Sequence, residues 1–327
     1  MLTRRALLRL MSAAAAGAAL RPSVTLAQRG APPRVGWLSY VTNPDQGLEH
    51  LREGLRELGY AEGKSFVVVA RFADWDFTRL PRLVEELGGE RLDVVVSRGP
   101  STDYLKPLRA KVPVVFAYSG DPVVAGFADA LGRPGRNMTG ITFMALELSA
   151  KRVDVLKELL PRAGRIALLS NPEHAGELEE YRVTDEAARR AGVVMTRHLV
   201  RNPQELVAMM AEIRSTRPDG MIVFPDSLTL NRRKDIADFA ARERIPTMYG
   251  WTEFVESGGL ISYGPTVTEH FKTLAKFVDK ILKGADANTL PIEQVSRIGL
   301  SLNMSAVRAM GLTVPPSILL RADRVIE

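Results

Sequence analysis

Three short apolar segments occur twice in the chain, in the same order and about 130 residues apart. The pairs are RVGWLS from Arg34 with RIALLS from Arg165, RLDVVVS from Arg91 with RPDGMIVF from Arg217, and KVPVVFAYSGDP from Lys111 with RIPTMYGWT from Arg244. Each segment contains a short apolar run, which is typical of a strand buried on both faces of a parallel sheet. Three matches at nearly constant spacing predict two α/β lobes of similar topology.

Amphipathic helical patterns separate these strands. After the first strand, Leu48, Leu51, Leu55 and Leu58 fall on one helical face, and the pattern ends at Gly59. Strands that alternate with helices in this way are typical of doubly wound sheets. We therefore expect an α/β fold of two doubly wound parallel-sheet lobes, joined by crossover strands that act as hinges.

The order of the segments also predicts how the chain divides between the lobes. We expect residues 34–140 plus 265–290 in lobe 1, and residues 141–263 plus 300–327 in lobe 2. The hinge crossings are expected near 141, 263 and 295–300, where turn-rich or extended segments interrupt the alternation of strands and helices.

The first 27 residues have the pattern of an export signal. Arg4 and Arg5 precede an alanine-rich apolar stretch through Leu20, and small residues end at Ala27. The run TRRALLR from Thr3 is similar to a twin-arginine signal, and a general secretory signal remains the alternative. This leader holds four arginines and no acid, so the rest of the chain carries 40 basic and 38 acidic residues. That near balance argues against a nucleic-acid partner.

The chain contains no cysteine. This excludes disulfides, zinc-thiolate sites, a thiol nucleophile and a cysteine-linked lipid anchor. An exported chain with neither a lipid anchor nor a membrane helix is expected in the periplasm.

The sequence carries no recognisable catalytic motif. It lacks a Gly-x-Ser-x-Gly elbow, a Gly-x-x-x-x-Gly-Lys phosphate loop, a Gly-x-Gly-x-x-Gly loop and a His-Glu-x-x-His zinc motif. The four histidines, His50, His174, His198 and His270, are scattered without metal-ligand spacing, and we assign them no role. We predict no enzyme activity, no metal site and no cofactor.

Polar and aromatic residues recur where the predicted strands end, and these form the candidate ligand site. They are Ser39, Tyr40, Ser101, Thr102, Tyr118, Ser119, Asp121, Asn171, Asp226, Tyr249, Trp251 and Tyr263. Ligands of open α/β sheets bind at the carboxyl ends of the strands. Hydroxyl groups and free helix N–H groups suit a carboxylate, while Asp121 or Asp226 suits an ammonium group. The aromatic rings suit an apolar or aromatic body.

One stretch shows the strand, turn and helix pattern most clearly. In the segment from Lys111 to Pro122, an apolar strand ends in Tyr118, Ser119, Gly120 and Asp121. Asp121 and Pro122 predict the N-cap and first residue of a helix that runs through Phe127. A plain N-cap is the alternative role for Asp121, and the same holds for Asp226.

Several longer motifs resemble one family, the ABC-transporter substrate-binding proteins of the tryptophan/tyrosine type. They are RVGWLS (Arg34), GLRELGYAEGKS (Gly54), VVFAYSGDPVVAGF (Val114), RPGRNMTG (Arg133), ELSAKRVDVLKELLP (Glu147), FVESGGLISYGP (Phe254), FVDKILKG (Phe277) and TVPPSILLRADRVIE (Thr313), with the Pro225-Asp226 turn. The resemblance implies a type I periplasmic binding fold, with two lobes that close on a small solute and dock on an ABC permease in the membrane, without catalysis. We expect a monomer.

The chain departs from the family pattern at two places. Gly135-Arg136 stands where members often have Gly-Gly. The Asn171-Pro172 loop continues as Glu173-His174-Ala175, whereas the usual loop is rich in asparagine and serine. The second departure lies close to the expected ligand.

We expect an extracytoplasmic receptor of an ABC importer that captures a carboxylate-bearing solute in a cleft between the lobes. The solute would be an amino acid, aromatic ones included, or a related organic acid. A periplasmic ligand sensor for a membrane signalling protein is one alternative, and a secreted hydrolase is another, which needs a nucleophile–base pair. A repressor needs a helix-turn-helix ahead of the lobes, where this chain has the export signal.

Overall fold

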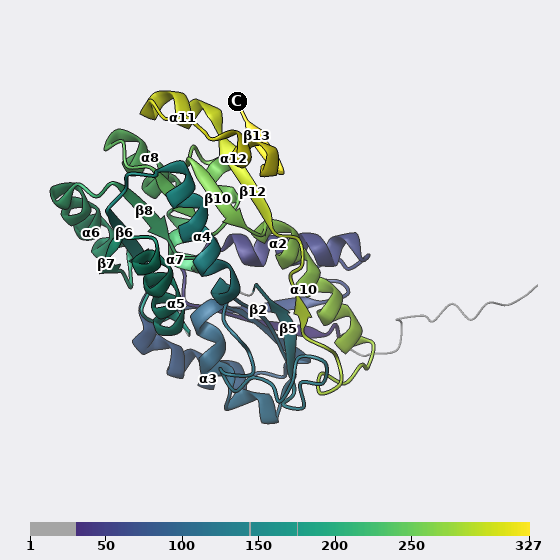
Figure 1. Ribbon diagram of the computed structural model, residues 1–327. Helices are drawn as coiled ribbons and strands as arrows, with labels where there is room; N and C mark the ends of the chain where they lie inside the picture. Colours follow the sequence, from purple (N-terminus) through teal and green to yellow (C-terminus); the bar gives the residue numbers. More distant parts are fainter. Residues whose placement is uncertain (1–30, 144, 175) are drawn as a thin grey trace, which may run out of the picture. The chain divides into compact units, whose positions relative to one another are not determined.

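The computed structural model describes residues 31–143, 145–174 and 176–327. The predicted signal peptide, residues 1–27, lies outside these ranges. Residues from Pro33 onward form one compact unit that contains two sheets flanked by helices (Figure 1). The predicted fold class, two α/β sheets of mostly parallel strands, is confirmed.

The first sheet has the strand order β11-β5-β4-β3-β1-β2, and its pairs are all parallel. Its strands are β1 (Arg34–Ser39), β2 (Val67–Phe72), β3 (Val94–Arg98), β4 (Val114–Tyr118), β5 (Met138–Thr142) and β11 (Glu293–Gln294). The helices in this part of the chain are α2 (Gln46–Glu57) and α3 (Leu80–Gly88), with short 3₁₀ helices at Phe77–Arg79, Gly99–Leu105 and Leu108–Ala110. β1, β3 and β4 are almost fully buried, as their apolar sequences require.

The second sheet has the order β13-β12-β10-β9-β8-β6-β7, in which only the pair β10 and β12 is antiparallel among the described strands. Its strands are β6 (Arg165–Ser170), β7 (Val194–Leu199), β8 (Gly220–Val223), β9 (Thr247–Tyr249), β10 (Ile261–Gly264), β12 (Gly299–Asn303) and β13 (Arg324–Ile326). The other helices are α4 (Ala145–Leu159), α5 (Glu177–Arg190), α6 (Pro203–Thr216), α7 (Ser227–Asn231), α8 (Arg233–Arg242), α9 (Glu253–Glu256), α10 (Val267–Leu282), α11 (Met304–Met310) and α12 (Pro316–Arg321).

The two sheets repeat one topology. Strands β2-β1-β3-β4-β5 and strands β7-β6-β8-β9-β10 are arranged in the same order, that of a doubly wound sheet whose order reverses beside its first strand. The three sequence pairs occupy equivalent places, since β1 corresponds to β6, β3 to β8 and β4 to β9. The similar topology expected from the repeat is therefore confirmed.

The chain passes between the sheets three times. β5 belongs to the first sheet through Thr142 and α4 follows it; β10 belongs to the second sheet and α10 follows it; β11 and β12 lie in different sheets. α10 packs closely on α2, because a Cβ added at Gly54 of α2 would lie 2.8 Å from the Cβ of Ala275. The segment 267–282 is thereby attached to the helices of the first sheet.

A hydrogen bond strengthens this helix pair. Tyr60 follows α2, and its hydroxyl donates to Oδ1 of Asp279 on α10 over 2.8 Å. Burial and this hydrogen bond raise the pKa of Tyr60 to about 12. The folded protein therefore favours the protonated phenol.

Tyr60→Phe should lower the free energy of unfolding near neutral pH by about 1 kcal/mol, the usual value of one hydrogen bond. Because the folded pKa is raised, this contribution is complete below the unfolded pKa of about 10. It is lost as the pH rises through about 12. Urea denaturation of both proteins from neutral to alkaline pH should show the difference shrinking, and a constant difference would contradict the prediction.

The predicted helix after β4 is wrong. Residues 122–126 form a hydrogen-bonded turn in which the N–H of Ala125 donates to the carbonyl of Asp121 over 2.9 Å. Gly126 then adopts φ of +74°, which ends the helical backbone, and Phe127 is buried in the core. Asp121 does cap the turn, because its Oδ1 accepts from the N–H of Val123 over 2.7 Å.

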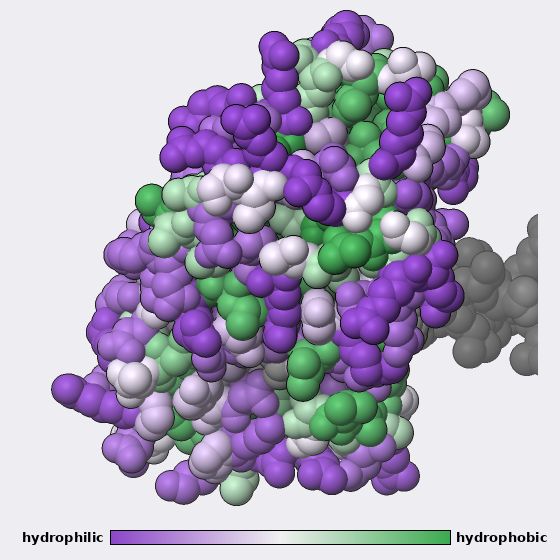
Figure 2. Space-filling view, turned by 60° about the vertical axis from the view of Figure 1, so that its left-hand side comes forward, coloured by the Kyte–Doolittle hydropathy of each residue, from purple (hydrophilic) through white to green (hydrophobic). Residues whose placement is uncertain are grey.

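One cluster of buried hydrophobic residues contains members from both sheets, including Trp37 and Phe116 of the first and Leu169 and Tyr249 of the second. On the face shown in Figure 2, hydrophilic side chains predominate and hydrophobic ones form small separate groups. Within the described ranges, every helix is too short or too polar to span a bilayer.

Candidate functional site

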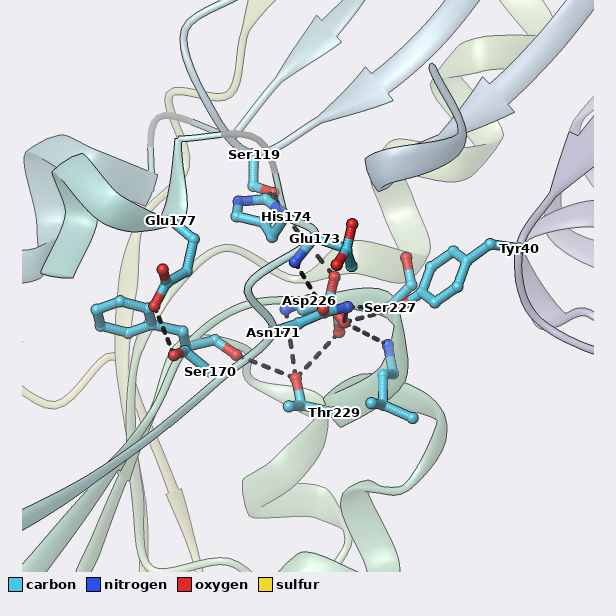
Figure 3. Close-up of polar contacts among 12 residues, drawn as sticks. Tyr40, Ser119, Ser170, Asn171, Glu173, His174, Glu177, Asp226, Ser227 and Thr229 are labelled. Carbon is cyan, nitrogen blue, oxygen red and sulfur yellow. Dashed lines mark hydrogen bonds and ion pairs between the residues drawn. The ribbon is translucent and has the colours of Figure 1, made fainter. Parts of the chain in front are cut away.

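Polar side chains from the carboxyl ends of both sheets meet at Asp226. This residue follows β8 and caps α7, and its Oδ1 accepts from the N–H of Leu228 over 2.7 Å. The same oxygen accepts from the hydroxyl of Tyr40 (2.8 Å), which follows β1, and from Nδ2 of Asn171 (3.1 Å), which follows β6. Figure 3 shows Tyr40 reaching this carboxylate from the opposite side to Asn171. Asp226 thus joins the two sheets through one oxygen atom.

Ring packing fixes the position of Tyr40, and a raised pKa keeps its hydroxyl a hydrogen-bond donor. Its ring stacks on Phe77 with 4.9 Å between centroids and meets Trp75 edge to face at 5.3 Å. Burial, followed by the negative charge of Asp226, raises the pKa of Tyr40 well above its usual value. The hydroxyl therefore stays protonated at physiological pH.

His174 provides a second contact between the sheets. Oγ of Ser119, which follows β4, lies 3.1 Å from Nε2 and 3.4 Å from Nδ1 of His174, in the loop after β6 (Figure 3). Nδ1 of His174 is 3.9 Å from Oδ2 of Asp226, a distance too long for a hydrogen bond. His174 is only 4% exposed, so it is enclosed between the two sheets.

Two neighbouring cavities lie beside this polar cluster. The smaller, of about 20 Å³, is lined by residues that include Arg98, Ser119, Asp226 and Trp251. The larger, of about 270 Å³, is lined by charged residues together with Leu230, Val267 and Phe271. Arg98 and these three apolar residues line both cavities. The two cavities are therefore adjacent.

Several buried polar atoms at these strand ends make no hydrogen bond to any described residue. They are Oδ2 of Asp226, Nε1 of Trp251, Oγ of Ser39, Oγ of Ser101 and Oγ1 of Thr102. Buried polar groups are normally paired, and each exception calls for an explanation. Asp226 and Trp251 are also among the residues that line the smaller cavity.

The structure brings together five of the twelve predicted site residues: Tyr40, Ser119, Asn171, Asp226 and Trp251. Ser39, Ser101, Thr102, Tyr118 and Tyr249 are buried at the strand ends but do not line either cavity. For all twelve residues, a role in ligand binding stays a prediction.

The other two predicted residues, Asp121 and Tyr263, lie apart from the cluster. Asp121 is exposed and lines a separate cavity of about 90 Å³ with Ser119. Tyr263 packs against the second hydrophobic cluster, and its carbonyl accepts from Nε of Arg152 over 2.9 Å.

Sequence reasoning missed Arg98 and His174. Arg98 is the last residue of β3, directly after the apolar run Val94–Val96 and Ser97. The sequence signal that could have identified Arg98 is a charged residue at the end of a fully buried strand. His174 was passed over because only the fold places it beside Ser119, 55 residues earlier.

One family model matches most of the chain. Residues 43–326 match the sequence profile of a family described as ABC transporter substrate binding protein. A tyrosine-binding protein of Clostridioides difficile is 18% identical over 282 residues, which cover 85% of this chain and 81% of that protein.

Two solved structures resemble the fold closely. An ABC domain from Streptococcus pneumoniae in complex with L-Trp has a TM-score of 0.78 and 22% identity, covering 90% of this chain and 100% of that one. A conserved domain protein of Vibrio cholerae has a TM-score of 0.79 and 23% identity, with the same coverage. At these identities the structural likeness establishes the fold.

Proposed function

This chain belongs to the ABC transporter substrate binding protein family, whose members bind small molecules and deliver them to ABC permeases, and from this premise we propose what it carries and how. It is the receptor of an importer and captures a carboxylate-bearing solute, either an amino acid or a related organic acid, between its two sheets. The family is typically extracytoplasmic. We place this member in the periplasm, reached through the twin-arginine or general secretory signal expected in residues 1–27.

The observation that carries the proposal is the cluster at Asp226. A buried carboxylate is costly unless it is paired, and Oδ1 of Asp226 accepts three hydrogen bonds while Oδ2 accepts none from the described residues. Asp226 lines a cavity that Trp251 also lines. An ammonium group of an amino acid would complete the bonds of Oδ2.

The size of the two cavities supports a small solute. The larger measures about 270 Å³, below the range of roughly 300–1,000 Å³ that is typical of sites for drug-sized ligands. Leu230, Val267 and Phe271 offer an apolar surface to the solute body, which is compatible with an aromatic amino acid. The relatives that bind tyrosine and L-Trp favour the same class.

We propose that the two lobes move about a hinge. The hinge is formed by the three crossings, which lie after β5, after β10 and between β11 and β12. Solute would favour the closed arrangement, because it contacts residues from both sheets only when they meet. The contacts of Tyr40 with Asp226 and of Ser119 with His174 belong to that closed arrangement.

A hydrolase is the second function that one observation favours, because Ser119, His174 and Asp226 stand in the order of a nucleophile, a base and an acid. The geometry does not support it. Oγ of Ser119 is almost equidistant from both ring nitrogens, and the distance from His174 to Asp226 is 3.9 Å. A working triad requires one aligned bond on each side of the imidazole.

Thermal unfolding tests the proposal with the twenty amino acids, benzoate and myo-inositol as probes. At least one carboxylate should raise the midpoint by about 4–8 °C at a hundredfold excess over its Kd. The protein should first be unfolded and refolded to remove any carried-over solute. No shift with any compound would contradict solute capture.

A further inference from the structure

Arg98 stands at the place where a doubly wound sheet binds its ligand. It ends β3, the neighbour of β1, and the strand order of the first sheet reverses between these two strands. Its side chain is 2% exposed, and Cζ lies 5.4 Å from the ring centroid of Phe271. A guanidinium so deeply buried requires charged or hydrogen-bonding partners.

Asp45 neutralises the charge of Arg98 but leaves two of the guanidinium nitrogens without a hydrogen bond. Nη2 lies 3.3 Å from Oδ1 of Asp45. That oxygen already accepts from the N–H of Gly47 over 2.9 Å, and Oδ2 accepts from Nε1 of Trp37 over 3.2 Å. Among the described residues, none accepts a hydrogen bond from Nε or Nη2 of Arg98. Asp45 therefore positions the guanidinium of Arg98. The N–H groups on Nε and Nη2 of Arg98 remain without an acceptor among the described residues.

Arg98 borders the same cavity as Asp226. Arg98, Asp226 and Trp251 line the smaller cavity, and Arg98 also lines the larger one. The smaller cavity is thus lined by a cationic residue, a tryptophan and a carboxylate residue. A guanidinium can hold both oxygens of a carboxylate at once, because its N–H groups form a planar fork.

We propose that Arg98 binds the carboxylate of the solute and makes that group obligatory for capture. The inference rests on the function proposed above and adds the residue that selects the ligand. With the carboxylate at Arg98, the body of the solute extends along Leu230, Val267 and Phe271 into the larger cavity. The alternative is a structural role only, in which Arg98 supports Asp45 and packs on Phe271.

Isothermal titration calorimetry tests whether Arg98 binds the carboxylate. The two ligands are the carboxylate that gives the largest thermal shift and the corresponding amide. Arg98→Gln should weaken binding of the carboxylate by about 10–150-fold, the usual cost of a lost charged hydrogen bond. Affinity for the amide should change by less than about 3-fold. A purely structural role would change both affinities alike.

Two further variants keep the test decisive. Arg98→Lys retains the charge beside Asp45 and should bind the carboxylate with intermediate affinity, since an ammonium lacks the planar fork. Arg109→Gln is the matched control, because Arg109 lines neither of these two cavities and its Nη1 donates to the carbonyl of Gly126 over 3.0 Å. It should change affinity by less than about 3-fold. Near-ultraviolet circular dichroism confirms that each variant is folded.

The outcomes separate the two proposals. If wild type binds a carboxylate and Arg98→Gln binds it equally well, the inference about Arg98 is overturned and the proposed function stands. If only myo-inositol or the amide binds, solute capture stands and the requirement for a carboxylate fails. If no probe binds wild type, the proposed function fails, and the inference fails with it.

Discussion

Asp226→Ala is expected to abolish solute binding, with a loss of more than about 100-fold in affinity. The substitution removes the acceptor proposed for the ammonium group of the solute. It also leaves the hydroxyl of Tyr40 and the amide of Asn171 without the oxygen that both now share. Because α7 loses its N-cap as well, the free energy of unfolding should fall by about 2–4 kcal/mol.

Asp226→Asn is the matched control that separates these effects. Asparagine caps helices as well as aspartate does, and its oxygen can accept the bonds that Oδ1 accepts now. Stability should therefore stay within about 1 kcal/mol of wild type, while affinity for an amino acid should still fall by about 10–150-fold because the charge is gone. Calorimetric titration and urea denaturation measure the two quantities. An Asp226→Asn variant with wild-type affinity would show that the carboxylate does not bind the solute.

Gly140→Ala is expected to unfold the protein or to lower its free energy of unfolding by about 3–5 kcal/mol. Gly140 lies in β5 opposite Phe116 of β4, with φ of +146°. An added Cβ would lie 2.0 Å from the carbonyl oxygen of Phe116, which is backbone and cannot move away without breaking the sheet. The strain falls on the strand that precedes the first crossing.

Gly132→Ala makes the same chemical change without a clash. No described atom lies within 4 Å of a Cβ at this position, so stability should change by less than about 1 kcal/mol. Urea denaturation of the two variants measures the contrast. Equal stabilities would contradict the close approach of β4 and β5 at Gly140.

The strands could be predicted from the sequence because burial on both faces leaves long apolar runs such as Val94–Val96 and Val114–Ala117. The helix expected after Asp121 was wrong because an N-cap and a proline are local signals. The backbone at Gly126 and the burial of Phe127 depend on the core, and they end the helical turn.

The candidate site was predictable to the extent that strand ends identify it. Tyr40, Asn171 and Asp226 each follow a strand, and the parallel topology brings them together. A polar or aromatic residue at a strand end can contact a ligand or belong to the core, and its type does not tell which. The sequence therefore did not separate Ser101 and Tyr249 from Asp226. The sequence did not identify Arg98 and His174 as site residues, because their contacts are with residues distant in the sequence. Arg98 contacts Asp45, and His174 contacts Ser119.

The most direct test of the central claim is a crystal structure of the protein with the carboxylate solute that binds it in solution. We predict that its carboxylate lies on Arg98, that its polar head lies between Asp226 and Trp251, and that contacts come from both sheets. A solute bound to one sheet only, or away from the carboxyl ends of the strands, would contradict the account.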